Sequence, residues 1–250
     1  MSQPHVALFI TCLTDQFYPR VGIAVTRILE HYGCRVSFPA AQTCCGRPFF
    51  DNGFLPEAGV LAERMVEIFG DCDYVVTPSG SCAAMVREHY PELLKGTEDE
   101  GKMLALRGRT YEFVEFLTKV LEVDLSHLSL PAPETITYHY TCHLRELGIQ
   151  DEGVRLLRQL GNVQFKAMEK TDQCCGFGGT LAVKYPAISG AIVQDKAQCI
   201  ADTQARTTVC NEAGCAMNIS GMCHRAGVKT NVRHLAEVLA EAMGIDVTQW

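Results

Sequence analysis

The sequence predicts an α/β fold of two pseudo-repeated lobes, each a small, mostly parallel sheet flanked by helices. Two observations support this prediction. Short apolar runs alternate with amphipathic stretches of helical period along the chain, which is the order that gives a parallel sheet covered on both faces. The cysteine pattern also repeats at a shift of 130 residues, because TC at 11–12 recurs at 141–142 and CCG at 44–46 recurs at 174–176.

Each lobe is expected to alternate strands and helices. In the first lobe, strands are predicted at residues 5–11, 34–38 and 74–77, and helices at 19–32, 56–69 and 103–121. In the second lobe, strands are predicted near 135–141, 163–168, 207–210 and 228–230, and helices near 151–160, 186–204 and 232–243. Residues 126–134 contain two prolines and no periodicity, which predicts a linker between a first lobe at 1–125 and a second at 135–250.

Cysteine is the unusual feature of the composition. The chain has 250 residues, enough to bury an apolar core without crosslinks, yet 13 of them are cysteines. An odd cysteine count in a chain of this length favours thiols held for metal or redox chemistry over a disulfide framework. The formal charge of −7 and the lack of a basic block argue against nucleic-acid binding. No apolar stretch is long enough to span a membrane, and the N-terminus lacks a signal-peptide pattern, so we expect a cytoplasmic location.

The predicted topology gathers four cysteines of each lobe at one edge of its sheet. One cysteine follows the first strand, the CC pair follows the second, and another follows the third. All therefore lie beyond the carboxyl ends of parallel strands, where open α/β sheets build their sites. The predicted metal-binding and cofactor-binding residues are Cys12, Cys44, Cys45 and Cys82 in the first lobe, and Cys142, Cys174, Cys175 and Cys215 in the second.

The cysteine spacings favour a multi-iron cluster over a single ion. A structural zinc site usually takes two ligands from a C-x-x-C loop, which this sequence lacks. Adjacent side chains of an extended backbone diverge, so a cysteine pair reaches two metal atoms more readily than one. The glycine after each pair permits positive φ and, because it has no Cβ, would let the backbone approach a cluster. A zinc-binding or thiol–disulfide protein without an iron–sulfur cluster remains the alternative.

The complete motif resembles a known family. The order C-x31-CCG-x35-C from Cys12 to Cys82, and C-x31-CCG-x38-C from Cys142 to Cys215, resembles the duplicated cysteine-rich CCG domain. That family includes the cysteine-rich subunits of heterodisulfide reductase, glycolate oxidase and anaerobic glycerol-3-phosphate dehydrogenase. It also includes the stand-alone lactate utilization protein A group, which the chain length and the strings SGSC and GCAMNI resemble most.

This resemblance implies an iron–sulfur electron-transfer subunit of a complex that oxidises L-lactate to pyruvate. The implied cofactor is an iron–sulfur cluster in each lobe, of the [4Fe–4S] type. The implied partners are a ferredoxin-like iron–sulfur protein and a third lactate-utilization subunit, with a small hydroxy acid as the substrate of the complex. No catalytic residue is assigned.

One departure from the family motif affects the cluster type. The fullest motif ends in C-x-x-C, which gives five cysteines to a noncubane [4Fe–4S] cluster, but here Ser79 and Glu212 stand at the first position of that pair. Four cysteines suffice for a cubane [4Fe–4S] cluster. Ser79 or Glu212 is then a candidate oxygen ligand.

The remaining cysteines and two histidines have weaker claims. Four cysteines are expected to be small buried residues of the core: Cys34, Cys72, Cys199 and Cys223. Cys210 is intermediate, a candidate fifth thiol near the second site. His143, beside Cys142, is either a proton acceptor or hydrogen-bond donor at the site, or a solvent-facing loop histidine. His139 lies in an apolar strand, which favours a core histidine whose hydrogen bonds are satisfied.

Overall fold

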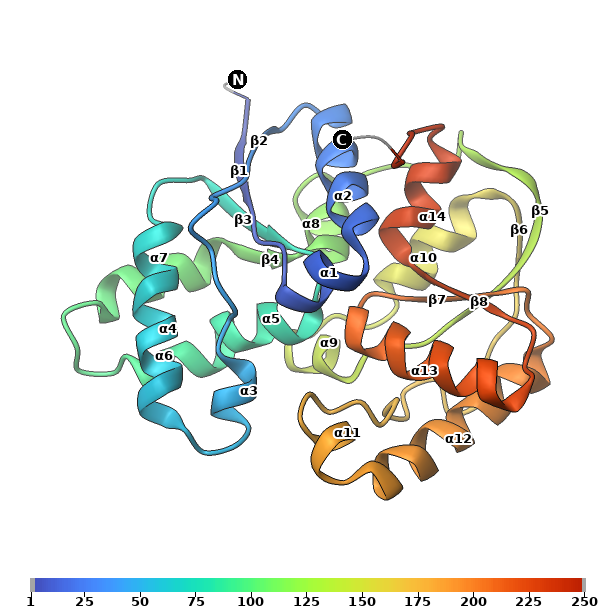
Figure 1. Ribbon diagram of the computed structural model, residues 1–250. Coiled ribbons are helices and arrows are strands. Elements are labelled where there is room, and N and C mark those ends of the chain that lie inside the picture. Colours follow the sequence, from blue (N-terminus) through green and yellow to red (C-terminus); the bar gives the residue numbers. More distant parts are fainter. Residues whose placement is uncertain (1–2, 249–250) are drawn as a thin grey trace. The chain divides into compact units, whose positions relative to one another are not determined.

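The computed structural model describes residues 3–248, which form two α/β units (Figure 1). The elements follow one another in the order β1 His5–Leu8, α1 Cys12–Phe17, α2 Pro19–His31, β2 Arg35–Ser37, α3 Arg47–Phe50, α4 Leu55–Ile68, β3 Tyr74–Thr77, α5 Gly80–Ala84, the π-helical turn η1 Met85–His89, α6 Tyr90–Leu93, α7 Glu100–Arg109, β4 Thr110–Glu112, α8 Phe113–Lys119, β5 Ser129–Tyr138, α9 Cys142–Glu146, α10 Glu152–Gln159, β6 Gly161–Phe165, α11 Leu181–Lys184, α12 Pro186–Thr203, β7 Thr207–Cys210, α13 Ala213–Ala226, β8 Asn231–His234 and α14 Leu235–Ala242. The predicted fold class is confirmed.

The first unit is built on a parallel sheet of strand order β2-β1-β3-β4. β1 and β3 are central neighbours and pair with Val6 opposite Tyr74. Helices α4, α6 and α7 cover one face of the sheet, and α2 and α8 cover the other (Figure 1). The core on the α4 side contains Phe9, which packs edge-on against Phe69 with ring centroids 5.6 Å apart. The chain leaves β1 and β3 in opposite directions across the sheet, so their carboxyl ends form a topological switch point.

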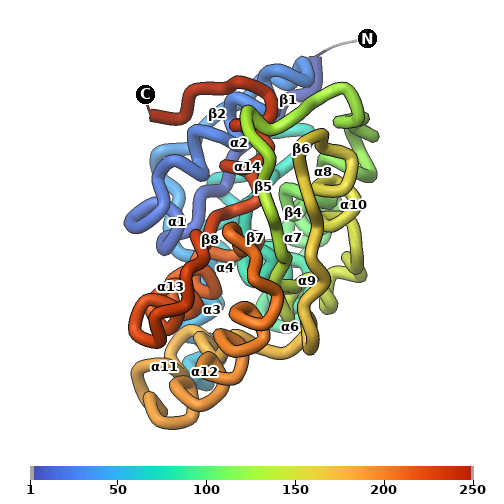
Figure 2. Tube along the Cα trace, turned by 90° about the vertical axis from the view of Figure 1, so that its right-hand side faces the viewer, coloured from blue at the N-terminus to red at the C-terminus, as the bar shows by residue number. Residues whose placement is uncertain are grey.

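The second unit repeats this architecture with strand order β6-β5-β7-β8, again all parallel. Figure 2 shows the four strands side by side. β5 and β7 pair with Ile136 opposite Thr207, which are the counterparts of Val6 and Tyr74 under the sequence repeat. Helices α12 and α13 cover one face, and α10 and α14 cover the other (Figure 1). The repeat in the cysteine pattern is therefore a repeat of the fold.

The helix predicted over residues 103–121 is wrong, because a strand divides it. α7 ends at Arg109, β4 occupies Thr110–Glu112, and α8 starts at Phe113. A β-branched and an aromatic residue begin this strand, which suits a partly buried edge position beside β3. The buried Glu112 carboxylate then accepts hydrogen bonds from the backbone N–H groups of Val114 and Glu115 and so caps α8.

The predictions between residues 211 and 234 also need correction. The sequence pattern predicts no helix directly after Cys210, yet α13 runs from Ala213 to Ala226. Gly227, in the left-handed region at φ 69°, ends that helix. The strand predicted at 228–230 therefore lies later, at Asn231–His234, and the last helix begins at Leu235.

The predicted linker, residues 126–134, also needs correction because its second half belongs to a strand. The chain passes from the first compact unit to the second between Glu122 and Val123. β5 already begins at Ser129, and residues 129–134 pair only with β6, through an irregular register. Proline is tolerated there because this half of β5 has only one neighbouring strand, so some of its backbone N–H groups have no strand to donate to.

Among the residues described, no helix has the length and apolarity needed to cross a bilayer.

Candidate metal centres

Helix starts that follow the central strands position four of the predicted ligands. Cys12 is the first residue of α1, shortly after β1, and Cys82 is the third residue of α5, shortly after β3. In the second unit, Cys142 opens α9 after β5, and Cys215 is the third residue of α13 after β7. Backbone N–H groups without partners inside the helix lie at these starts, so they can donate to the sulfurs of a bound centre.

The loop after β2 brings the first CC pair to the same place. The Cys12 and Cys44 Sγ atoms lie 4.0 Å apart, and those of Cys45 and Cys82 lie 3.2 Å apart. Cys12 also interacts electrostatically with Cys82, and Cys45 with Cys44. The four cysteines predicted for the first lobe therefore gather at the switch point.

The second unit gathers its cysteines in the same way. The Cys175 and Cys215 Sγ atoms lie 3.1 Å apart, and the Cys142 thiol hydrogen-bonds to Cys174. In both units the second thiol of the CC pair lies within 3.2 Å of a cysteine from a distant part of the chain. All thirteen cysteines of the chain lie in the described part and are free thiols.

One thiol in each group is strongly acidic. Hydrogen bonds from Cys12 and Cys45 lower the pKa of Cys44 to about 3, and hydrogen bonds from Cys142 and Cys175 lower the pKa of Cys174 to about 2. The same hydrogen bonds, together with burial, raise the pKa of the donating thiols. Each group therefore holds one thiolate at neutral pH, and its donating thiols keep their protons unless a bound cation displaces them.

The glycine after each CC pair adopts a positive φ, 86° for Gly46 and 80° for Gly176. The Gly176 N–H lies 3.3 Å from the Cys174 sulfur, so it can donate to that thiolate. A Cβ on Gly176, however, would lie 2.7 Å from the backbone oxygen of Ser189 in α12. Helix α12 therefore fills the space that the missing Cβ of Gly176 leaves. The sequence had instead predicted that a cluster approaches the backbone there.

Ser79 and Glu212 both stand immediately before a helix. Ser79 is fully buried and caps α5, because its hydroxyl accepts a hydrogen bond of 3.3 Å from the Cys82 backbone N–H. Glu212 precedes α13 and is 7% exposed, and its electrostatic effect reaches Cys142. The serine therefore has a structural role that positions Cys82.

Other cysteines and a histidine lie near or away from these groups. The Cys210 thiol is fully buried and contacts the backbone oxygens of Glu212 and Arg233 at 3.7 and 4.0 Å. The His143 Nδ1 lies 3.8 Å from the Cys142 sulfur. Cys34, Cys199 and Cys223 are buried as expected, whereas Cys72 is only partly buried.

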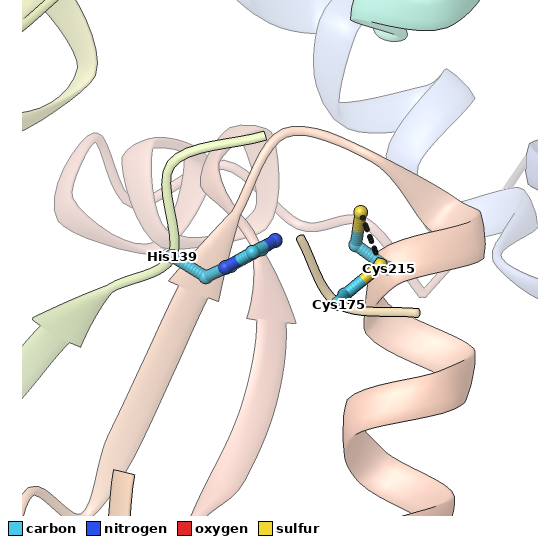
Figure 3. Close-up of side chains that lie close together, drawn as sticks. All are labelled: His139, Cys175 and Cys215. Atoms are coloured by element: carbon cyan, nitrogen blue, oxygen red, sulfur yellow. Dashed lines mark hydrogen bonds between the residues drawn. The ribbon is translucent and has the colours of Figure 1, made fainter. Parts of the chain in front are cut away.

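His139 is the residue that the sequence interpretation undervalued. It directly follows β5 and is fully buried, as predicted, but among residues 3–248 neither ring nitrogen has a hydrogen-bond partner. Leaving such a group unpaired costs about 1–3 kcal/mol. Burial, with a smaller effect of the Lys196 cation, lowers the pKa of His139 to about 3, so its imidazole is neutral. One ring nitrogen of His139 and the sulfurs of Cys175 and Cys215 all lie within 4.8 Å of one another (Figure 3).

A buried cation stands behind the second group of cysteines. Lys196 of α12 is fully buried, and its ammonium donates to the backbone oxygen of Lys170 and approaches the Met168 sulfur at 3.9 Å. It interacts electrostatically with Cys175 and His139. In the first unit the equivalent residue is Met65 of α4. Met65 lies seven residues after Ala58, which contacts Gly46, just as Lys196 lies seven residues after Ser189, which contacts Gly176. The positive charge favours anionic sulfur in the second unit, and Met65 supplies no such charge in the first.

Comparisons with known proteins agree with this duplicated arrangement. The sequence model of the CCG family, described as a cysteine-rich domain, matches residues 6–87 and 136–220. Lactate utilization protein A of Geobacillus thermodenitrificans (strain NG80-2) is 44% identical over 238 residues, covering 94% of this chain and 98% of that protein. Lactate utilization protein A 2 of Bacillus cereus (strain Q1) is 41% identical over 240 residues, covering 95% and 98%.

Among solved structures, the fold resembles a hypothetical protein from Helicobacter pylori, with a TM-score of 0.65 and 10% identity. That match covers 98% of this chain and 50% of the other, so the chain spans half the length of that protein. At this identity the likeness concerns the fold alone. The family match and the full-length relatives carry the assignment: the chain belongs to the CCG family of cysteine-rich domains, of which it contains two copies, and is a homologue of lactate utilization protein A.

Proposed function

We propose that this protein is an iron–sulfur electron-transfer subunit of a complex that oxidises L-lactate to pyruvate. The observation that supports it most strongly is the gathering of four free thiols at the switch point of each unit. The name of its full-length relatives supplies the lactate pathway. The proposed ligands are Cys12, Cys44, Cys45 and Cys82 in one unit, and Cys142, Cys174, Cys175 and Cys215 in the other.

The donor set fits an iron–sulfur cluster. Thiolates are the usual ligands of such clusters, and two sulfurs of each group are buried among apolar side chains, which limits access of water. When bound, a cluster accepts and donates one electron at a time. The residues hold it at helix starts, where N–H groups and the helix dipole stabilise negative sulfur.

The number of electrons released in the reaction supports a role for partner proteins. Conversion of L-lactate to pyruvate releases two electrons and two protons, whereas a cluster carries one electron in each step. We therefore propose that a ferredoxin-like iron–sulfur protein and a third subunit complete the complex, and that the two-electron step takes place with their help. Free thiols and cluster chemistry both fit a reducing cytoplasm.

A zinc protein is the second candidate. The group of His139, Cys175 and Cys215 favours it, because histidine nitrogen and cysteine sulfur are the ligands that zinc commonly takes. A thiol–disulfide protein is less well supported, since a disulfide between adjacent cysteines would close a strained ring.

Metal analysis after anaerobic purification separates these candidates. We expect about four irons and about four sulfides per unit, a brown colour and an EPR signal on reduction. L-lactate should reduce the clusters only when the partner subunits are present. A colourless protein with stoichiometric zinc, and no iron after reconstitution, would contradict the proposal.

Replacing Ser79 by alanine tests whether its oxygen is a ligand. Because the hydroxyl caps α5, we expect S79A to lose about 1 kcal/mol in the free energy of unfolding of the iron-free protein. The iron content should stay at the wild-type value. Ser81→Ala is the matched control, since it removes a neighbouring hydroxyl without removing the cap. A loss of iron in S79A alone, without the loss of stability expected from the missing cap, would identify the Ser79 oxygen as a ligand.

A further inference from the structure

His139 occupies a position where a side chain can reach the second group of cysteines. Figure 3 shows its ring extending from the end of β5 toward Cys175 and Cys215, which come from the loop after β6 and from α13. The ligand atoms of these three residues lie within 4.8 Å of one another, and all three residues are buried. The ring is fully buried, so this orientation is fixed by packing.

Both ring nitrogens of His139 are unpaired within the described range. A neutral imidazole has one N–H donor and one nitrogen with a free lone pair. The lone pair is the group that binds metals, whereas the N–H of the other ring nitrogen points away from a metal so bound. A bound metal centre would therefore satisfy one of the two ring nitrogens that the protein itself leaves without a partner.

The first unit has no equivalent ligand at this place. The His139 backbone N–H donates to the Val209 oxygen at 2.8 Å, as the Phe9 backbone N–H donates to the Val76 oxygen at 2.9 Å. Phe9 and His139 thus hold the same place, each three residues before the first cysteine of its group. The Phe9 ring belongs to the apolar core of its unit and offers no donor atom.

We propose that His139 is a fifth ligand, through a ring nitrogen, of the metal centre in the second unit, so that the two centres of this chain differ in ligand chemistry. The inference rests on the proposed function, in that it requires the second unit to bind an iron–sulfur cluster. The first centre has only cysteine ligands, and the second has cysteine and histidine. The imidazole is neutral, so a thiolate in its place would add negative charge to the second centre and lower its reduction potential.

Pulsed EPR with histidine labelled by ¹⁵N tests the ligand directly. The parent protein is Cys45→Ser, which is expected to retain only the second centre. In its reduced form we expect a strong ¹⁵N coupling from a directly bound imidazole. The coupling should vanish in C45S/H139F, where phenylalanine copies Phe9 of the first unit. It should persist in C45S/H143F, the control, because His143 adjoins Cys142 without belonging to the group around Cys175.

A second variant guards against a folding defect. In C45S/H139C a thiol replaces the nitrogen, so we expect iron to be retained, the ¹⁵N coupling to be lost and the potential to fall. Circular dichroism of each iron-free variant reports whether the fold is kept. If iron is bound and the ¹⁵N coupling is absent from the parent, or survives in H139C, the inference is overturned while the proposed function stands. A parent protein that binds zinc or no iron would instead overturn the proposed function and, with it, the inference.

Discussion

Replacing Cys45 by serine should remove about half of the bound iron, and replacing Cys175 by serine should remove the other half. Each of these buried thiols lies next to a second buried thiol of its own group, Cys82 or Cys215, at 3.2 or 3.1 Å. Serine cannot supply a thiolate, so each variant keeps only three of the four thiolates proposed to hold its centre. Iron and sulfide analysis of anaerobically reconstituted protein, with EPR on reduction, measures the loss.

Cysteines outside the two groups provide the controls. Cys34→Ala and Cys223→Ala remove buried thiols from the first and second unit, and neither should change the iron content. The double variant C45S/C175S should bind almost none. Loss of all iron in either single variant would show that both groups serve one shared cluster, which would contradict the assignment of one centre to each unit.

Replacing Gly176 by alanine should destabilise the iron-free protein much more than replacing Gly46. Both positions have a positive φ, which costs a residue with a Cβ about 1 kcal/mol or more. At Gly176 the new Cβ would also meet the Ser189 backbone oxygen at 2.7 Å, so the loop or α12 must shift, at a further cost of about 1–3 kcal/mol. At Gly46 the nearest atom, the Ala58 oxygen, is at an ordinary 3.5 Å.

Denaturant unfolding of the iron-free variants measures this difference. We expect a loss of about 1 kcal/mol in the free energy of unfolding for G46A and of about 3 kcal/mol for G176A. Gly190→Ala is a useful control in the second unit, because its Cβ would meet no atom within 4 Å and its φ is not positive. Equal losses of stability for G46A and G176A would show that the positive φ alone explains why glycine follows each cysteine pair.

The sequence was most informative where it repeats. The shift of 130 residues between TC and CCG motifs predicted two similar lobes, and the equivalent strand pairings of Val6 with Tyr74 and Ile136 with Thr207 confirm it. The placement of cysteines after parallel strands followed from topology alone, since any residue in that position reaches the carboxyl edge.

Other features depend on tertiary contacts that periodicity does not report. β4 has three residues and is stabilised by its pairing with β3, so within an amphipathic stretch it has no distinct pattern. α13 contains two internal glycines, which weaken any helical signal. The unpaired state of His139 is a property of its surroundings, although alignment of the two repeats would have set it against Phe9 and marked the difference.

The uneven burial of the thiols bears on how a centre is assembled. In the first group Cys12 is exposed and Cys44 partly so, while Cys45 and Cys82 are buried. In the second, Cys142 and Cys174 are partly exposed, and Cys175 and Cys215 are buried. The acidic thiolate of each group, Cys44 or Cys174, is therefore one that an incoming metal could reach from solvent, whereas the inner thiols are covered by the fold.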